Sequence, residues 1–269
     1  MIIAQTAASD SASEVEITMT TSKTLRIGIL LPPANTAMED EIPPFLPPAV
    51  HISFNRLSRE GRTLTRESLL SMARSVGRAA GDLAWCEPDT IVYGCTSGTF
   101  LDGIGNEEAL SRQITAETGL PSITTSTAVI QALQAVGARR VFMITPYPDT
   151  VNLHEIEFLA HYGIQVVAWD SFRCELSAGV SLIAPADVTA MALRHRDTVA
   201  GCDALFVSCT NLKVMGEIVT MERALGAPVV TSNQASLWAA LRQIGAEMSE
   251  GCGSLFQAAV LPATPLEAA

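Results

Sequence analysis

The sequence predicts an α/β protein made of two related three-layer αβα domains, each built on a mainly parallel sheet. Two observations predict this fold class. Short apolar runs of strand type alternate with longer stretches of helical period, and one order of strands and loops occurs twice along the chain. The 269 residues are enough for one or two domains with a sizeable core.

The expected elements alternate between strands and helices. Apolar runs mark strands at residues 26–31, 90–93, 121–124, 140–144, 165–168, 204–207 and 228–230. Apolar residues at helical spacing mark helices at residues 68–83, 129–136, 152–162, 185–199, 215–224 and 236–244. The helix at 68–83 shows this spacing at Leu69, Met72, Val76 and Leu83. The alternation predicts parallel sheets with helices on both faces.

An internal repeat is the strongest signal in the chain. The segment IGILLPPANT (27–36) matches VFMITPYPDT (141–150), and IVYGCT (91–96) matches LFVSCT (205–210). Cys95 follows Pro32 by 63 residues, and Cys209 follows Pro146 by the same 63. The stretches LPSITTS and APVVTS then close the two units in the same order. These matched blocks predict two copies of one fold.

Composition and charge narrow the classes of partner. The formal net charge is −11, which argues against nucleic acid or an anionic membrane as the main partner. No apolar run reaches about 18 residues, so no membrane span is expected. The Ala-, Ser- and Thr-rich stretch 1–24 lacks the pattern of a signal peptide and is expected to be a flexible tail. We expect a cytoplasmic protein.

Cofactor and metal motifs are not found in the sequence. The six cysteines show no C-x-x-C spacing, which disfavours a zinc knuckle and a disulfide framework. Neither a dinucleotide-binding nor a P-loop glycine motif is present. Of the two lysines, Lys23 lies in the tail, so Lys213 alone could carry pyridoxal phosphate, and no phosphate loop accompanies it. We therefore expect chemistry without a metal or cofactor.

The repeat places Cys95 and Cys209 at equivalent strand ends. Ligands of open parallel sheets bind beyond the carboxyl ends of the strands. If the two copies face each other about a pseudo-twofold axis, the two thiols meet across one interdomain cleft. Paired thiols suit proton transfer at a planar carbon, and a cysteine of lowered pKa also acts as a nucleophile. The polar residues after each cysteine offer donors to a small carboxylate.

Each of these residues also has a purely structural interpretation. A lone cysteine is more often a small buried apolar residue than a catalyst, and Cys86, Cys174, Cys202 and Cys252 are interpreted in that way. Tyr147 is as easily a packed side chain as a functional one. Asn35 is also compatible with a role in stabilising a turn. The matched strand-end positions favour catalysis only for Cys95 and Cys209.

The sequence resembles the aspartate/glutamate racemase superfamily, in its maleate cis–trans isomerase and arylmalonate decarboxylase branch. The resemblance rests on the two strand-Cys-Thr blocks, on the loop PPANT (32–36) and on GCTSGT (94–99). It covers about residues 25–257 and implies a division into domains. Residues 25–124 with 231–257 are expected to form the first α/β domain, 125–230 the second, and 258–269 a tail.

The resemblance also implies roles for individual residues. In maleate isomerases, the cysteine matching Cys95 is the nucleophile that adds to the double bond, and the one matching Cys209 is its acid/base partner. Asn35 and Tyr147 match residues that bind carboxylate. The full set of expected substrate-binding residues is Pro33, Asn35, Thr96, Ser97, Tyr147, Ser177, Thr210 and Asn211. Ser177 is a departure, because those isomerases carry an asparagine in this loop.

The function expected from the resemblance is isomerisation or racemisation of a small carboxylate by two cysteines. One alternative is a decarboxylase of the arylmalonate type, in which Cys209 alone would donate the proton. A racemase of the ectoine-utilisation type also keeps both cysteines. The alternative outside enzymology is a small-solute binding protein, since two facing α/β domains also suit a ligand clamp. A homodimer is compatible with the family, although the residues identify no interface.

Overall fold

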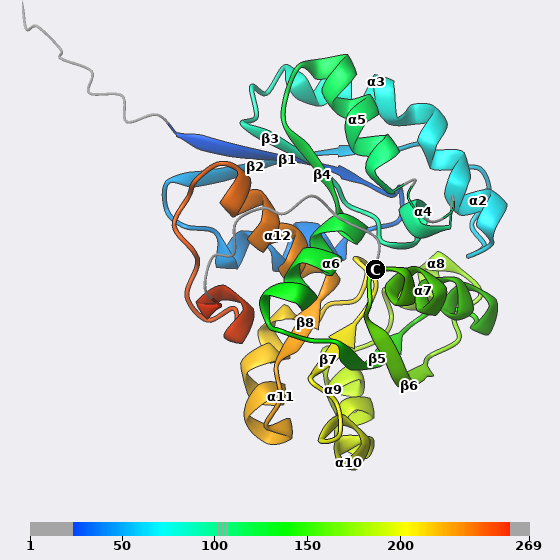
Figure 1. Ribbon diagram of the computed structural model, residues 1–269. Helices are drawn as coiled ribbons and strands as arrows, with labels where there is room; N and C mark the ends of the chain where they lie inside the picture. The colour runs from blue at the N-terminus through cyan, green and yellow to red at the C-terminus, as the bar shows by residue number, and fades with distance from the viewer. Residues whose placement is uncertain (1–23, 102, 104, 106, 259–269) are drawn as a thin grey trace, which may run out of the picture.

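Two four-stranded, all-parallel sheets form the framework of the protein (Figure 1). The computed structural model describes residues 24–101, 103, 105 and 107–258, so the predicted tails lie almost wholly outside the described residues. The first sheet has the order β2-β1-β3-β4 and consists of β1 (Leu25–Leu31), β2 (Val50–Arg56), β3 (Thr90–Tyr93) and β4 (Ser122–Thr124). The second has the order β6-β5-β7-β8 and consists of β5 (Arg140–Thr145), β6 (Gln165–Ser171), β7 (Ala204–Val207) and β8 (Val229–Thr231). The two parallel sheets confirm the predicted α/β fold, and their matching strand orders agree with the prediction of two copies of one unit.

Helices cover both faces of each sheet. Those in the first half of the chain are α1 (Ala37–Glu41), η1 (Pro43–Phe45), α2 (Arg66–Leu70), η2 (Ser71–Ser75), α3 (Val76–Ala84), α4 (Ser97–Phe100), α5 (Glu107–Thr118) and α6 (Thr125–Ala135). Those in the second half are α7 (Asp149–His161), α8 (Ser177–Val180), α9 (Pro185–Arg194), α10 (Arg196–Val199), η3 (Met215–Glu217), α11 (Ile218–Leu225), α12 (Ser232–Gln243) and η4 (Ser254–Gln257). Here η marks a 3₁₀ helix.

The structure differs from the sequence prediction in a few elements. Strand β2 and helix α5 are present but were not predicted. The single helix predicted at 68–83 is divided by η2, where the Ser71 and Ser75 hydroxyls donate to the carbonyl oxygens of Ser68 and Met72 at 2.6 and 2.9 Å. Such bonds between a side chain and the nearby backbone compete with regular helix. The predicted helix at 185–199 is likewise divided, into α9 and α10.

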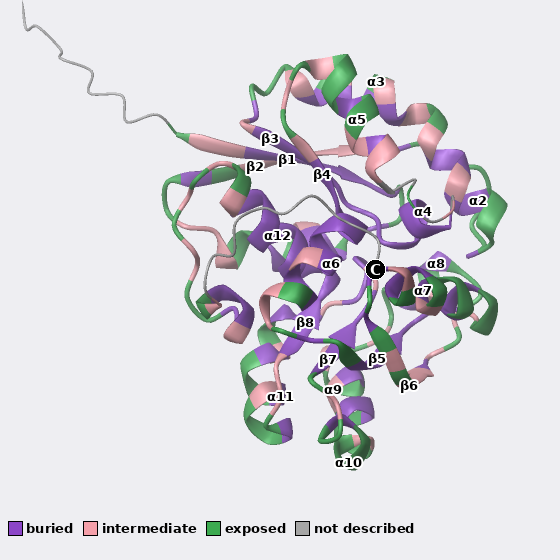
Figure 2. Ribbon diagram, in the orientation of Figure 1, coloured by how far each residue is buried: buried purple, intermediate pink, exposed green. Residues whose placement is uncertain are grey.

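Two helices lie between the sheets and join the two copies. Figure 1 shows α6 and α12 side by side in this layer, and Figure 2 shows that almost the whole of α12 is buried. Each begins at a threonine cap: the side chain of Thr124 accepts from the Thr127 N–H at 3.2 Å, and Thr231 forms a capping box with Gln234. These caps start both helices four residues before the predicted positions.

Polar contacts attach α12 to the first sheet. The Thr90 hydroxyl donates to the Gln243 Oε1 at 2.5 Å, and the Gln243 Nε2 donates to the Ser122 carbonyl oxygen at 3.3 Å. These bonds favour grouping α12 with the first domain, as the predicted boundaries do, and the division into domains stays a prediction. Among the described residues, no helix is both long and apolar enough to cross a membrane.

Gly94 packs where no side chain fits, directly before Cys95. A Cβ at this position would lie 2.9 Å from the Leu30 carbonyl oxygen, 2.9 Å from the Ile29 Cγ2 and 2.9 Å from the Met38 Sδ. We therefore expect Gly94→Ala to lower the free energy of unfolding by roughly 1–3 kcal/mol, the usual cost of overpacking. Urea denaturation measures this change. Gly216→Ala, whose Cβ would meet nothing within 4 Å, is the control, and equal stability of the two variants would contradict the packing argument.

Candidate active site

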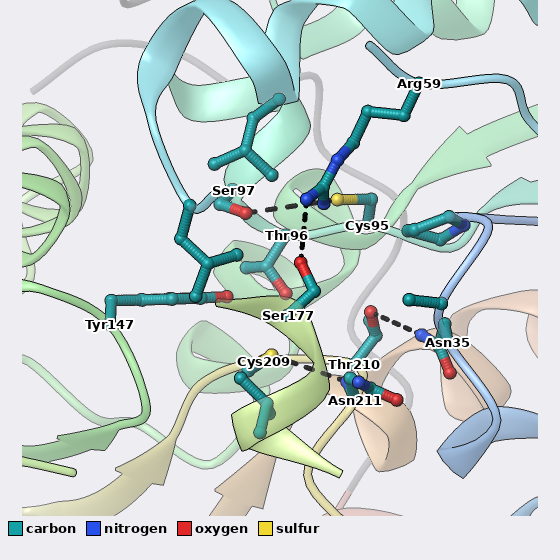
Figure 3. A pocket seen from close by; sticks show the side chains of 15 residues that line it. Asn35, Arg59, Cys95, Thr96, Ser97, Tyr147, Ser177, Cys209, Thr210 and Asn211 are labelled. Carbon is teal, nitrogen blue, oxygen red and sulfur yellow. Dashed lines mark hydrogen bonds between the residues drawn. The ribbon is translucent and has the colours of Figure 1, made fainter. Parts of the chain in front are cut away.

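One cavity lies where the carboxyl ends of both sheets meet (Figure 3). It offers a volume of about 40 Å³ to the centres of water molecules, so it fits a small ligand. The residues that line it are Pro32, Ala34, Asn35, Arg59, Leu64, Leu69, Cys95, Thr96, Ser97, Tyr147, Ser177, Val180, Cys209, Thr210 and Asn211. They come from the loops after β1, β2, β3, β5, β6 and β7. Both copies of the repeat therefore contribute to one site, at the edge where parallel sheets bind ligands.

Cys95 follows β3 and is buried in the cavity wall. The Gly98 N–H donates to its Sγ at 3.3 Å, and the Ser97 hydroxyl lies 4.0 Å from the same atom. The pKa of the Cys95 thiol is raised, because burial is the largest effect, and hydrogen bonds from Gly98 and Ser97 together with the positive charge of Arg59 offset part of this rise. All three of these groups stabilise a thiolate, so Cys95 is placed to act as a nucleophile.

Cys209 occupies the matching position after β7 but has a different backbone and different neighbours. Its φ is +112°, a value that costs energy for any residue with a side chain. Its N–H donates to the Ser232 hydroxyl at 3.0 Å, and its Sγ accepts from the Asn211 N–H at 3.4 Å and from the Tyr147 hydroxyl. Burial raises the pKa of Cys209 to about 12. This thiol therefore keeps its proton at neutral pH and can donate it.

Two further groups affect the charge near Cys209. Glu155 of α7 is buried and accepts a hydrogen bond from the Ser208 hydroxyl at 2.5 Å, and burial raises the pKa of this carboxyl to about 8. When ionised, Glu155 disfavours the Cys209 thiolate. Burial also raises the pKa of Tyr147 well above its ordinary value, so the hydroxyl stays a hydrogen-bond donor. Beside Cys209, the Glu155 carboxyl and the Tyr147 hydroxyl therefore both favour their protonated forms at neutral pH.

Hydrogen bonds between the copies hold the two cysteine turns in place. The Asn35 Nδ2 donates to the Thr210 hydroxyl at 3.0 Å, and this hydroxyl donates to the Gly94 carbonyl oxygen at 3.0 Å. The Thr96 hydroxyl donates to the Ser232 hydroxyl at 3.0 Å, the same group that accepts from the N–H of Cys209. The amide nitrogen of Asn35 keeps a second hydrogen that can reach a ligand.

The structure brings nine of the ten predicted site residues into this cavity. Pro33 is the exception: it is exposed and lines an outer depression that adjoins the cavity at Ala34, Arg59 and Ser177. The reason is the turn in which the Asn35 N–H donates to the Pro32 carbonyl oxygen at 3.0 Å, which turns Pro33 outward. The chemical roles of all ten residues stay predictions.

Among the lining residues that the sequence reasoning missed, Arg59 is the one polar or charged side chain. It lies in the loop after β2, a strand that was not predicted, and it has no matching residue in the repeat blocks. Comparing the loops after the second strand of each copy would have found it, because Ser177 lies in the equivalent loop after β6. Within the described residues, no cluster of three or more His, Cys, Asp or Glu side chains could hold a metal ion.

Comparison with known proteins shows that the chain is similar to proteins with two different activities. The family model described as arylmalonate decarboxylase matches residues 27–256. The arylmalonate decarboxylase of Bordetella bronchiseptica is 30% identical over 244 residues, which is 88% of this chain and 99% of the relative. The maleate isomerase of Nocardia farcinica (strain IFM 10152) is 27% identical over 242 residues, which is 86% of this chain and 95% of the relative.

A solved structure agrees with the fold. It is a Cys-to-Ser mutant of a Nocardia farcinica maleate cis–trans isomerase with a covalently bound succinylcysteine intermediate. It superposes with a TM-score of 0.79 at 22% identity and covers 86% of this chain and 98% of its own.

The strained backbone of Cys209 predicts an unusual order of stability. A positive φ costs roughly 1–3 kcal/mol for a residue with a Cβ, whereas glycine adopts it freely. We therefore expect Cys209→Gly to be about 1 kcal/mol more stable than Cys209→Ala in urea denaturation. At Cys95, which has no positive φ, the matched pair should show the reverse order, since glycine costs roughly 0.5–1 kcal/mol relative to alanine. Alanine being the more stable at both positions would contradict the strain.

Proposed function

The chain belongs to the arylmalonate decarboxylase family, and within it we propose a cofactor-independent cis–trans isomerase of a small dicarboxylate such as maleate. One observation carries the proposal: two thiols from equivalent strand ends line the same small cavity, Cys95 near the cation of Arg59 and Cys209 near the carboxyl of Glu155. Cys95 has neighbours that stabilise a thiolate, whereas burial, the largest effect on the pKa of Cys209, keeps the proton on that thiol. A nucleophile and an acid are the two groups that this isomerisation needs.

The reaction proceeds by addition, rotation and elimination. The Cys95 thiolate adds to one alkene carbon, and the π electrons of the double bond move onto the other carbon and its carboxylate. The Cys209 thiol gives its proton to this carbanion, which leaves a succinyl group on Cys95. Rotation about the new single bond follows. Cys209 then removes the proton, the C–S bond breaks, and the trans acid leaves with the Cys95 thiolate restored.

The succinylcysteine intermediate seen in the neighbouring isomerase structure supports this route. A pKa of about 12 for Cys209 supports its role as the proton donor, because the free thiol is nearly fully protonated at neutral pH. The later removal of the proton is helped by the hydrogen bonds from Tyr147 and Asn211, which favour the Cys209 thiolate. We assign substrate carboxylate binding to the Asn35 amide and the Tyr147 hydroxyl, with the donors of Thr96, Ser97, Thr210 and Asn211 around them.

Decarboxylation of a malonate is the second candidate, favoured by the relative at 30% identity. That reaction would use Cys209 as the proton donor and give no role to Cys95. One observation favours the isomerase instead: Cys95 has three thiolate-stabilising groups. The racemase of the ectoine-utilisation type and the solute-binding protein have no such support. A cytoplasmic location, a homodimer and the independence of any cofactor stay predictions.

Serine substitutions test the two-thiol mechanism. We expect Cys95→Ser and Cys209→Ser each to lower the conversion of maleate to fumarate by at least about 100-fold, since a positioned acid/base alone contributes at least that much. Proton NMR in deuterium oxide follows isomerisation and deuterium uptake together. Cys252→Ser is the control, because this buried thiol lies outside the cavity.

Two results would reject the isomerase. One is near-full activity of Cys95→Ser on maleate. The other is release of carbon dioxide from an arylmalonate that survives Cys95→Ser and is lost in Cys209→Ser, which is the outcome expected for the decarboxylase.

A further inference from the structure

We propose that Arg59 binds a carboxylate of the substrate and that Ser177 positions it, so that this pair selects acids carrying a negative charge at the mouth of the cavity. The inference rests on the proposed function, because it assigns part of the same site. It does not concern the reacting carbon, which lies between the two thiols.

Arg59 is a half-buried cation that has no carboxylate partner among the described residues. It is the only charged side chain among the described residues that line the cavity. Several other arginines pair with a carboxylate, as Arg56 does with Glu39 and Arg78 with Asp82, but none of the described residues forms an ion pair with Arg59. Burial lowers the pKa of Arg59, which reflects the cost of removing a charge from water. An anionic ligand would offset that cost.

The hydrogen bonds of Arg59 leave donors for such a ligand. The Nη2 donates to the Ser177 hydroxyl at 2.8 Å and to the Thr63 carbonyl oxygen at 3.2 Å, and the Nε donates to the Gly61 carbonyl oxygen at 3.3 Å. The guanidinium has five N–H donors. Within the part of the chain that the structure describes, the Nη1 donates to no acceptor. Its two hydrogens are available to a carboxylate, and Figure 3 shows the guanidinium beside Cys95.

The backbone around Arg59 is fixed on both sides. The N–H groups of its neighbours, Ser58 and Glu60, donate to the hydroxyls of Ser75 and Ser71, each at 2.9 Å. These are the same serines that divide the helix predicted at 68–83. Such a fixed loop orders the long side chain before a ligand arrives, which lowers the entropic cost of binding.

A short clasp joins the Arg59 loop to the Ser177 loop across the mouth of the cavity. The Leu64 N–H donates to the Glu175 carbonyl oxygen at 2.9 Å, and the Ser177 N–H donates to the Arg62 carbonyl oxygen at 3.2 Å. The two loops follow equivalent strands, β2 and β6, of the two copies. Arg59 and Ser177 line both the cavity and the outer depression, so they lie between the thiols and the outside.

This arrangement gives a reason for serine at position 177, where the resemblance leads one to expect asparagine. The Ser177 hydroxyl accepts a hydrogen bond from Arg59 instead of offering an amide donor to the ligand. The donor to the carboxylate is then Arg59, which carries a full charge. A guanidinium distinguishes a carboxylate from a neutral amide far better than an asparagine does, since hydrogen bonds between charged groups are about twice as strong.

Binding measurements on a protein that cannot turn over test this assignment. Isothermal titration of the Cys95→Ser protein is carried out with the dianions maleate, succinate and malonate, and with maleamate, in which one carboxylate is a neutral amide. Adding Arg59→Gln is expected to lower the affinity for the best-binding dianion roughly 10- to 100-fold, because a hydrogen bond between charged groups is lost. The affinity for maleamate should change by less than about 3-fold.

Matched variants separate binding from structure. Arg62→Gln removes a neighbouring cation that lines only the outer depression and should leave both affinities unchanged. Arg59→Lys keeps the charge but loses the planar, bidentate arrangement of donors. Its affinity for the dianion should therefore lie between that of the Cys95→Ser parent and that of Arg59→Gln. Ser177→Ala should lower the affinity for the dianion more than the affinity for maleamate. Thermal unfolding shows whether each variant is folded.

Three outcomes would overturn the proposal: an affinity of Arg59→Gln for the dianion within about 3-fold of the parent, an equal loss for maleamate, or no binding of any of the three dianions to the parent protein. If Arg59→Gln instead changes only the pH dependence of Cys95 alkylation by iodoacetamide, Arg59 serves the thiolate and the assignment is also wrong. If dianions bind through Arg59 but the wild-type protein forms no fumarate from maleate, the proposed function fails and the assignment stands.

Discussion

The burial of α6 and α12 between the two sheets is the constraint on which the site depends. Both helices are surrounded by protein, yet both carry polar residues, and these side chains must find partners because unpaired buried polar groups are costly. The hydroxyls of Thr125 and Ser236 lie 2.9 Å apart and join the two helices. The Ser232 hydroxyl joins the turns of both cysteines. Satisfying these bonds permits few relative positions of the sheets.

Equivalent positions in two copies have acquired unequal chemistry. Cys95 and Cys209 follow corresponding strands, Cys95 buried and Cys209 half-buried, and the removal of each thiol from water raises both pKa values. The difference lies in the surroundings: Arg59 lies near Cys95, whereas Glu155 lies near Cys209. The backbone differs as well, because Cys209 alone of the two has a positive φ. These differences are the basis on which we propose a nucleophile in one copy and a proton donor in the other.

The sequence predicted those parts of the protein that repeat. The matched blocks located the ends of β1, β3, β5 and β7 and with them most residues of the cavity. Strand β2 was missed because its run VHISFNR mixes polar and apolar residues, as expected for a strand at the edge of a sheet. Helix α5 was missed for a similar reason, since its sequence EEALSRQITAET carries few apolar residues.

Arg59 shows why the rest of the site could not be predicted. Its position depends on the edge strand, on two serines of η2 and on a clasp between loops that are more than 100 residues apart in sequence, as the Arg59–Ser177 bond shows. Each of these contacts is tertiary and leaves no local pattern. Pro33 illustrates the converse: its motif was visible in the sequence, but the direction of the side chain was set by one turn.

The central claim is that Cys95 forms a covalent bond to the substrate while Cys209 handles the proton. Intact-protein mass spectrometry of Cys209→Ser incubated with maleate tests it most directly. When Cys95 adds to the alkene in this variant, water replaces the missing thiol as a slower proton donor, whereas elimination from the adduct lacks the Cys209 base. The account predicts a gain equal to the mass of one maleic acid, located by peptide mapping on Cys95 and not formed in the Cys95→Ser, Cys209→Ser double variant. A protein that keeps its unmodified mass, or an adduct located on another cysteine, would contradict the account.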